Sequence, residues 1–181
     1  MKTIAAIIAC LATALPAAAQ TAEDIAIVTR QAQILEQITE SGDIAASLKF
    51  LPPTLLDRNA AAQGLSRAEF DAMMTESMAE LAGISKVRES TIATADMVWQ
   101  SLPDGALLAI MPTVNIIEVT LEPGDAPMLI EETSATLALM DQGAWRVVRA
   151  GSHTQQDSLR AAFPALKDVT LPTATTKVLD Q

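Results

Sequence analysis

The sequence predicts an α+β domain in which N-terminal helices pack against a curved, mainly antiparallel sheet. Two observations support this. Between residues 21 and 83, apolar side chains recur at helical spacing and are bounded by helix caps and prolines. From Ile84 onward, β-branched residues, alternating polarity and turn motifs replace that pattern. Such a change is typical of helices gathered on one side of an antiparallel sheet.

Two helices are expected at the start of the domain. Thr21 and Asp24 form a helix-start box ahead of apolar residues at helical spacing. Gly42 is expected to end that helix in a left-handed conformation. Asp43 then begins a second helix, which Pro52 and the proline after it stop.

A further helix follows after one short turn at Leu55 and Leu56. Ser66 and Glu69 form its capping pair, and Gly83 ends it. Its apolar stripe comprises Phe70, Met73, Met74, Met78 and Leu81. A methionine-rich stripe suits either core packing or an adaptable binding surface, and core packing is the commoner use.

Four strands are expected, at residues 86–95, 106–120, 128–140 and 144–152. Short turns at 103–105, 122–125 and 141–143 would join them as hairpins. Pro112 predicts a bulge or a sheet edge within its strand. A short helix over residues 157–163, stopped by Pro164, and a mobile tail over 173–181 complete the prediction.

The first 19 residues are typical of a secretory signal peptide. Lys2 precedes an apolar run over residues 4–15, which is shorter than the roughly 20 residues that span a bilayer. Small residues then favour cleavage between Ala19 and Gln20. This predicts one periplasmic or secreted domain over residues 20–172. The alternative is lipid anchoring at Cys10, but the segment before that cysteine is short for such a signal.

Charge narrows the range of partners. The chain has 12 basic and 22 acidic residues and a net charge of −10 at pH 7. Nucleic acid and anionic membrane surfaces are therefore disfavoured, because both require clustered Lys and Arg. No stable membrane insertion is expected. A small apolar ligand, an envelope protein or a second copy of the chain stays open as a partner.

Three residues are candidates for ligand binding, namely Trp99, Trp145 and Arg149. Strand alternation places Trp145, Val147 and Arg149 on one sheet face. If that face lines an interior, Arg149 lies at its rim and can receive an anionic ligand. For Arg149, the alternative is a stem packed on the sheet with its head in water, and for Trp99 it is a place in the core.

No catalytic residue is assigned. The chain has no Tyr, and its only His, His153, falls in a loop after the last strand. A buried acid can serve as a general base, but each acid considered is more simply a helix cap or surface residue. Those acids are Asp43, Asp57, Asp71, Asp96 and Glu118.

No metal or other cofactor is expected. Cys10, the only cysteine, lies in the leader, so the mature domain has neither a disulfide nor a thiolate ligand. Glu131 and Glu132 are adjacent, and their side chains point to opposite faces of an extended strand. The sequence has no glycine-rich phosphate loop.

Five short segments of the sequence, through their residues and their order along the chain, are similar to exported bacterial members of the nuclear-transport-factor-2-like superfamily. The resemblance covers residues 24–172 and rests on 41–43, 51–56, 70–81, 144–148 and 159–164. It implies a sheet curled into an open cone around helices, whose cavity holds a small apolar ligand, an active site or nothing. Fold alone does not decide among these.

Two functions therefore stay open. The first is a non-catalytic binding or interaction module of the bacterial envelope. The second is an isomerase, dehydratase or hydrolase for a small molecule, in which a buried acid acts as general base. The enzymes that this family includes place acids, His or Tyr inside the cone, and this chain lacks Tyr.

Overall fold

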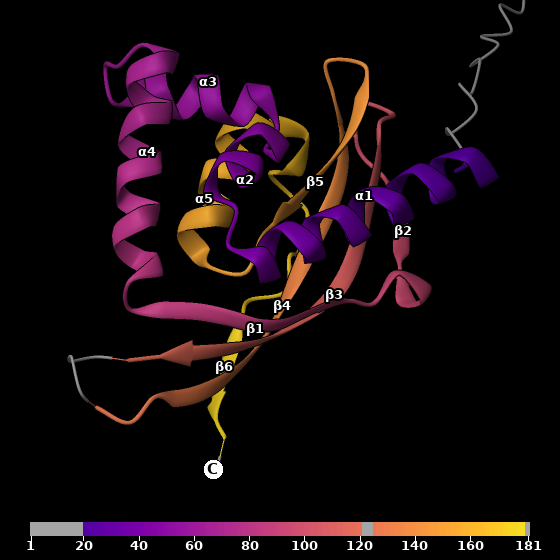
Figure 1. The fold of residues 1–181 in the computed structure, drawn as a ribbon. Coiled ribbons are helices and arrows are strands. Elements are labelled where there is room, and N and C mark those ends of the chain that lie inside the picture. The colour runs from indigo at the N-terminus through magenta and orange to yellow at the C-terminus, as the bar shows by residue number, and fades with distance from the viewer. Residues whose placement is uncertain (1–19, 121–124, 180–181) are drawn as a thin grey trace, which may run out of the picture.

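The computed structural model describes residues 20–120 and 125–179, and in them helices pack on a strongly curled antiparallel sheet (Figure 1). The predicted α+β class is thereby confirmed. The predicted leader, including Cys10 and Ala19, and most of the predicted turn at 122–125 lie outside the described residues. The α-helices are α1 (Ala22–Ser41), α2 (Ile44–Phe50), α3 (Pro53–Ala62), α4 (Arg67–Ala82) and α5 (His153–Ala162).

The predicted caps set most helix boundaries. Thr21 accepts a hydrogen bond from the backbone N–H of Asp24 in a capping box that begins α1. Gly42 follows that helix with φ 67°, a left-handed conformation that costs glycine little. Asp43 caps α2, and Ser66 forms the capping box of α4 with Glu69.

All strand pairs in the sheet are antiparallel. Its path is β1 (Ser85–Ile92), β3 (Leu107–Val119), β4 (Met128–Asp141) and β5 (Ala144–Arg149). The short strand β2 (Val98–Ser101) pairs with the first part of β3, while β1 pairs with its last part. On the other side of the sheet, β6 (Thr175–Val178) pairs with the first part of β4 and β5 with its last part.

Pro112 lies where β3 changes partners on one side. It stays in register with Ala135 of β4, so of the two predicted features, a bulge or a sheet edge, the bulge is absent, and the register shift occurs in β1 between Val87 and Glu89. On its other side, β3 pairs with β2 up to Ile110 and with β1 from Thr113. The missing N–H of proline therefore falls between two strands, where it interrupts no ladder.

Both faces of the sheet are covered. On one face, Val28, Ala32 and Leu35 of α1 pack with Met111, Val147 and their neighbours. On the other face, the core includes residues from α3, α5 and the segment that follows it, namely Leu55, Leu159, Leu166 and Leu171, with Leu108, Leu137, Leu139 and Val148 of the sheet. A third cluster joins α3 to Phe70 of α4.

Four elements differ from the prediction. The turn expected at Leu55 and Leu56 is the ten-residue helix α3. Helix α5 begins at His153 rather than at residue 157, because Ser152 and Gln155 form a capping box. The strands β2 and β6 were not predicted, and β6 lies within the segment expected to be a tail. None of the described helices combines the length and apolar character needed to cross a bilayer.

Candidate functional site

A pocket of about 690 Å³ lies where the C-terminal half of α1 meets α2 to α5 and the strands β1 and β5. Residues 85–87 at the start of β1 and 147–149 at the end of β5 both line it. These strands stand at opposite ends of the strand order. Figure 1 shows the curl of the sheet, and residues of both strands line the same pocket.

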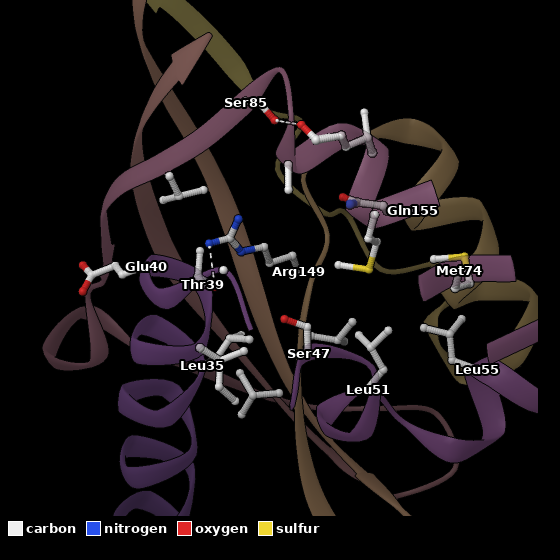
Figure 2. A pocket seen from close by; sticks show the side chains of 18 of the residues that line it. Leu35, Thr39, Glu40, Ser47, Leu51, Leu55, Met74, Ser85, Arg149 and Gln155 are labelled. Carbon is white, nitrogen blue, oxygen red and sulfur yellow. Dashed lines mark hydrogen bonds between the residues drawn. The ribbon is translucent and has the colours of Figure 1, made fainter. Parts of the chain in front are cut away.

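One part of the pocket wall is apolar. Leu51 at the end of α2 and Leu55 of α3 face Met74 and Met78 of α4, and Leu159 of α5 joins them. Figure 2 shows Leu51, Leu55 and Met74 together on the side of the pocket away from α1. The methionine stripe thus divides between two roles, because Phe70, Met73 and Met74 also pack against α3.

Arg149 lies at the other side of the pocket, where its guanidinium approaches α1 (Figure 2). Its Nη2 donates hydrogen bonds to Asn115 Oδ1 at 2.8 Å, Ser90 Oγ at 3.1 Å and Thr39 Oγ1 at 3.3 Å. Its Nε is buried and has no hydrogen-bond partner among the described residues. The same part of the chain places no carboxylate in an ion pair with this guanidinium.

Strand alternation explains the polar neighbours of Arg149. Asn115 and Thr113 lie on the same face of β3 as Met111, and all three are fully buried. Asn115 lies opposite Ser90 of β1, whose hydroxyl donates to Asn115 Oδ1 at 2.9 Å. A row of buried polar side chains therefore crosses the face that α1 covers and holds the guanidinium at its end.

Burial lowers the pKa of Arg149 from its ordinary value, and the negative charge of Glu132 opposes that shift. Arginine remains protonated in proteins even so. Glu132 does not approach as an ion-pair partner, and its Oε2 accepts a hydrogen bond from Asn115 Nδ2 at 3.1 Å. Arg149 is therefore a largely desolvated cation with unused donor capacity at a cavity.

Among the described residues, two other charged ones line the pocket, Lys86 and Glu40. Both side chains are exposed. Glu40 Oε1 accepts a hydrogen bond from the backbone N–H of Ser90 at 2.9 Å, and Figure 2 shows its carboxylate directed away from Arg149. Glu40 is the only acid among the described residues that line the cavity.

The two candidate tryptophans lie together but apart from Arg149. The rings of Trp99 and Trp145 meet edge to face, with centroids 5.4 Å apart. Trp145 is buried in the core beneath α1, and its Nε1 donates to Asp24 Oδ1 at 2.9 Å. Neither tryptophan belongs to the described lining of the large pocket.

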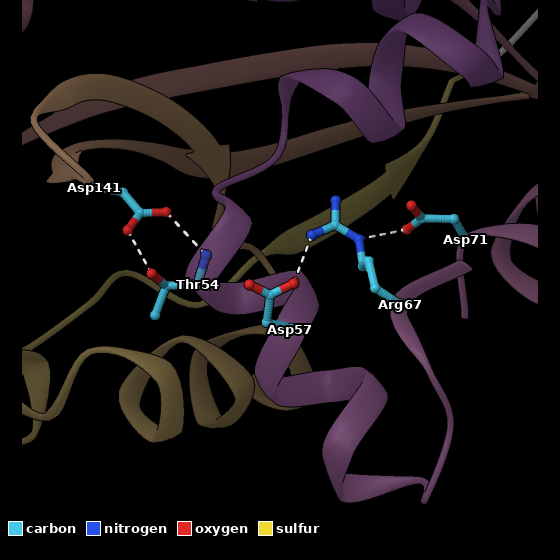
Figure 3. A network of polar contacts seen from close by, with 5 residues as sticks. All are labelled: Thr54, Asp57, Arg67, Asp71 and Asp141. Carbon is cyan, nitrogen blue, oxygen red and sulfur yellow. Dashed lines mark hydrogen bonds and ion pairs between the residues drawn. The ribbon is translucent and has the colours of Figure 1, made fainter. Parts of the chain in front are cut away.

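The acids considered as general bases have local partners or face solvent. Asp43 caps α2, and Asp57 and Asp71 both accept hydrogen bonds from Arg67 at 2.8 Å (Figure 3). Glu118 pairs with Arg88, and Asp96 is exposed.

His153 begins α5 with an exposed side chain, where a loop position was expected. Across residues 20–120 and 125–179, no cluster of three or more His, Cys, Asp or Glu side chains is arranged to hold a metal ion.

Only part of the pocket was foreseen. Strand alternation singled out Arg149, and the methionines were noted as a stripe with two uses. Ser90 and Asn115 were missed, although a polar residue on the inward face of an otherwise apolar strand is a readable signal. The contribution of α1, through Thr39, depends on helix placement and had no local signal. The chain matches no protein-family model, no curated protein and no solved structure.

Proposed function

We propose that this chain is a non-catalytic binding protein that holds a small, mostly apolar molecule in the pocket between α1, α4 and β5. The observation that carries the proposal is the cavity itself. Its volume of about 690 Å³ falls within the roughly 300–1,000 Å³ typical of small-molecule sites. Leucine and methionine side chains form much of its wall, and a few polar groups converge at one end.

The charges that line the pocket favour binding over proton transfer. A general base must reach the proton that it removes, within about 2.6–3.2 Å or through one water. Glu40 is exposed and already accepts a backbone hydrogen bond, and the candidate acids considered from the sequence pair elsewhere or face solvent. The isomerase, dehydratase or hydrolase alternative therefore has less support than the binding function.

Two further proposals accompany this function. Four helices followed by a curled antiparallel sheet support a relationship to the nuclear-transport-factor-2-like superfamily. The sequence of residues 1–19 supports export and work in the bacterial envelope. The mass of the protein isolated from cells tests the second of these, because cleavage after Ala19 and lipidation of Cys10 give different masses.

The binding function is tested with N-phenyl-1-naphthylamine, a neutral apolar fluorophore, titrated into the full chain. Ser47 lines the pocket and is half-buried, so Ser47→Trp places an indole in the cavity. Ala45 is exposed on the same helix and lies outside the described pocket lining, so Ala45→Trp is the matched control. Because the indole takes the place of buried ligand surface, we expect Ser47→Trp to weaken binding by about tenfold or more.

Ala45→Trp should bind the fluorophore as the unaltered chain does, and circular dichroism should show both variants folded. The proposal fails if the unaltered chain binds neither this fluorophore nor the two alkyl ligands 1-decanol and decanoate. It also fails if folded Ser47→Trp binds the fluorophore with undiminished affinity.

A further inference from the structure

We propose that the ligand is an amphiphilic monoanion, with a carboxylate head against Arg149 and an alkyl body among the leucine and methionine side chains. This inference rests on the proposed function and adds to it the class of ligand and the direction in which it lies. It follows from the unused donors of Arg149, from the charges around the pocket and from the separation of its polar and apolar ends.

The guanidinium of Arg149 has hydrogen-bond donors for which no described residue is an acceptor. All three of its hydrogen bonds to described residues leave from Nη2, toward Thr39, Ser90 and Asn115. These contacts fix the plane of the group and leave Nη1 without a partner in the described chain. A guanidinium that the protein orients through one nitrogen is prepared to donate through another.

The balance of charge at the pocket differs from that of the whole chain. The whole chain has 22 acidic and 12 basic residues, yet the part of the chain that the structure describes lines the pocket with two cations, Arg149 and Lys86, and one acid, Glu40. Glu40 is engaged by the backbone of β1, and Glu132 accepts from Asn115. A desolvated charge without a close counter-ion is costly, and an anion bound at Arg149 removes much of that cost.

The cations that line the pocket limit the head group of the ligand to one negative charge. Arg149 is the only half-buried cation in the described lining, since Lys86 is exposed at the rim. A carboxylate matches a single guanidinium in charge and in planar geometry. A phosphate monoester carries up to two charges, and the second would lie in the cavity without a buried partner.

The apolar side chains of the pocket set the direction of the ligand's alkyl body. Leu55 and Met74 lie across the pocket from the guanidinium (Figure 2). With the head at Arg149, an alkyl chain extends toward these side chains and away from the acid at the rim. Methionine side chains adapt to ligands of differing shape, so the site is suited to a class of chain lengths rather than to one molecule.

The experiment compares decanoate with 1-decanol, which share a chain length and differ in the charge of the head. Calorimetric titration of the full chain at pH 8 should show decanoate binding at least about tenfold more tightly, as expected for charge-assisted hydrogen bonds. Arg149→Met should lose this preference and still bind decanol. Arg88→Met removes the same charge from a residue outside the described lining, paired with Glu118, and should keep the preference.

A second measurement needs no variant and stands even if Arg149→Met fails to fold. The Arg149 Nε–H resonance in the unaltered chain should shift when decanoate is added and should not shift with decanol. Equal affinities for the two ligands in the unaltered chain, or a preference that persists in folded Arg149→Met, would overturn the anionic head and leave the binding function intact. If decanoate, decanol and the neutral fluorophore all fail to bind, the proposed function itself is wrong.

Discussion

Trp145 Nε1 donates a 2.9 Å hydrogen bond to Asp24 Oδ1, which joins β5 to the first turn of α1 across 121 positions of the chain. The same carboxylate closes the capping box, because its Oδ2 accepts from the backbone N–H of Thr21 at 2.9 Å and from the Thr21 hydroxyl at 2.7 Å. One side chain thus both begins α1 and anchors it to the sheet.

The Asp24 contacts predict a pH dependence. The backbone and then the side-chain hydrogen bonds of Thr21, followed by that of Trp145, lower the pKa of Asp24 in the folded state. The stability gained is therefore complete above the unfolded value of about 3.9 and is lost as the pH falls through the folded pKa. We expect the difference in Tm between the unaltered chain and Asp24→Asn to be largest near neutral pH and to shrink below about pH 4. A difference that is constant from pH 7 to pH 3 would contradict this.

Asp141 caps α3 from a distant part of the sequence (Figure 3). Pro52 offers no side-chain cap, and Asp141 accepts instead from the backbone N–H and the hydroxyl of Thr54, at 3.0 and 2.5 Å. Asp141 is only 4% exposed. Its replacement by Ala should lower the free energy of unfolding by about 2 kcal/mol, the range of buried hydrogen bonds to a charged group.

Urea unfolding measures the loss at Asp141. Thr54→Val, which keeps the backbone donor and removes only the hydroxyl, should cost less than Asp141→Ala. If Asp141→Ala cost no more than a surface substitution, roughly 0.5 kcal/mol, then Asp141 would not be the cap of α3.

Arg67 should matter far less, although it contacts two carboxylates. Asp57 and Asp71 each lie 2.8 Å from its guanidinium, and the side chains of all three are between 37 and 58% exposed. Solvent screens such pairs, so Arg67→Ala should change the free energy of unfolding by less than about 1 kcal/mol. If Arg67→Ala lowered the free energy of unfolding as much as Asp141→Ala does, then burial would not explain why the two residues should differ in their contribution to stability.

Two glutamates of α1 bind the outer edge of β1. Glu36 Oε1 accepts from the backbone N–H of Ile92, and Glu40 Oε1 accepts from that of Ser90. In Glu36→Ala, the Ile92 amide should exchange with solvent about tenfold faster, since the loss of roughly one hydrogen bond makes local opening easier. Hydrogen exchange followed by NMR checks this, with Glu89→Ala at an exposed position of β1 as control. Unchanged exchange at Ile92 would mean that Glu36 does not protect it.

The success of sequence reasoning depended on how local each determinant is. The caps at Thr21 and Ser66 act within four residues, and both were predicted. The capping box of Ser152 and Gln155 is equally local, yet the predicted helix starts at residue 157, four residues after the observed start of α5. Helix α3 was underestimated because its cap, Asp141, lies 87 positions away from Thr54.

The short strands and the pocket depend on contacts between distant segments. The strands β2 and β6 have four residues each and are defined by their pairing with β3 and β4. Period-2 alternation correctly placed Trp145 and Arg149 on one face, yet Trp145 packs under α1 while Arg149 reaches the cavity. The course of α1 across the sheet separates them, and no local pattern reports that course.

The two glutamate contacts on β1 bear on whether this sheet edge can pair with a strand of another molecule. An edge strand with free N–H groups is a template on which a strand from another molecule can grow. Here carboxylates occupy the amides of Ser90 and Ile92, so an incoming strand must first displace two charged side chains. Helix α1 therefore hinders cross-β association at this edge. This protection is lost if the helix detaches from β1.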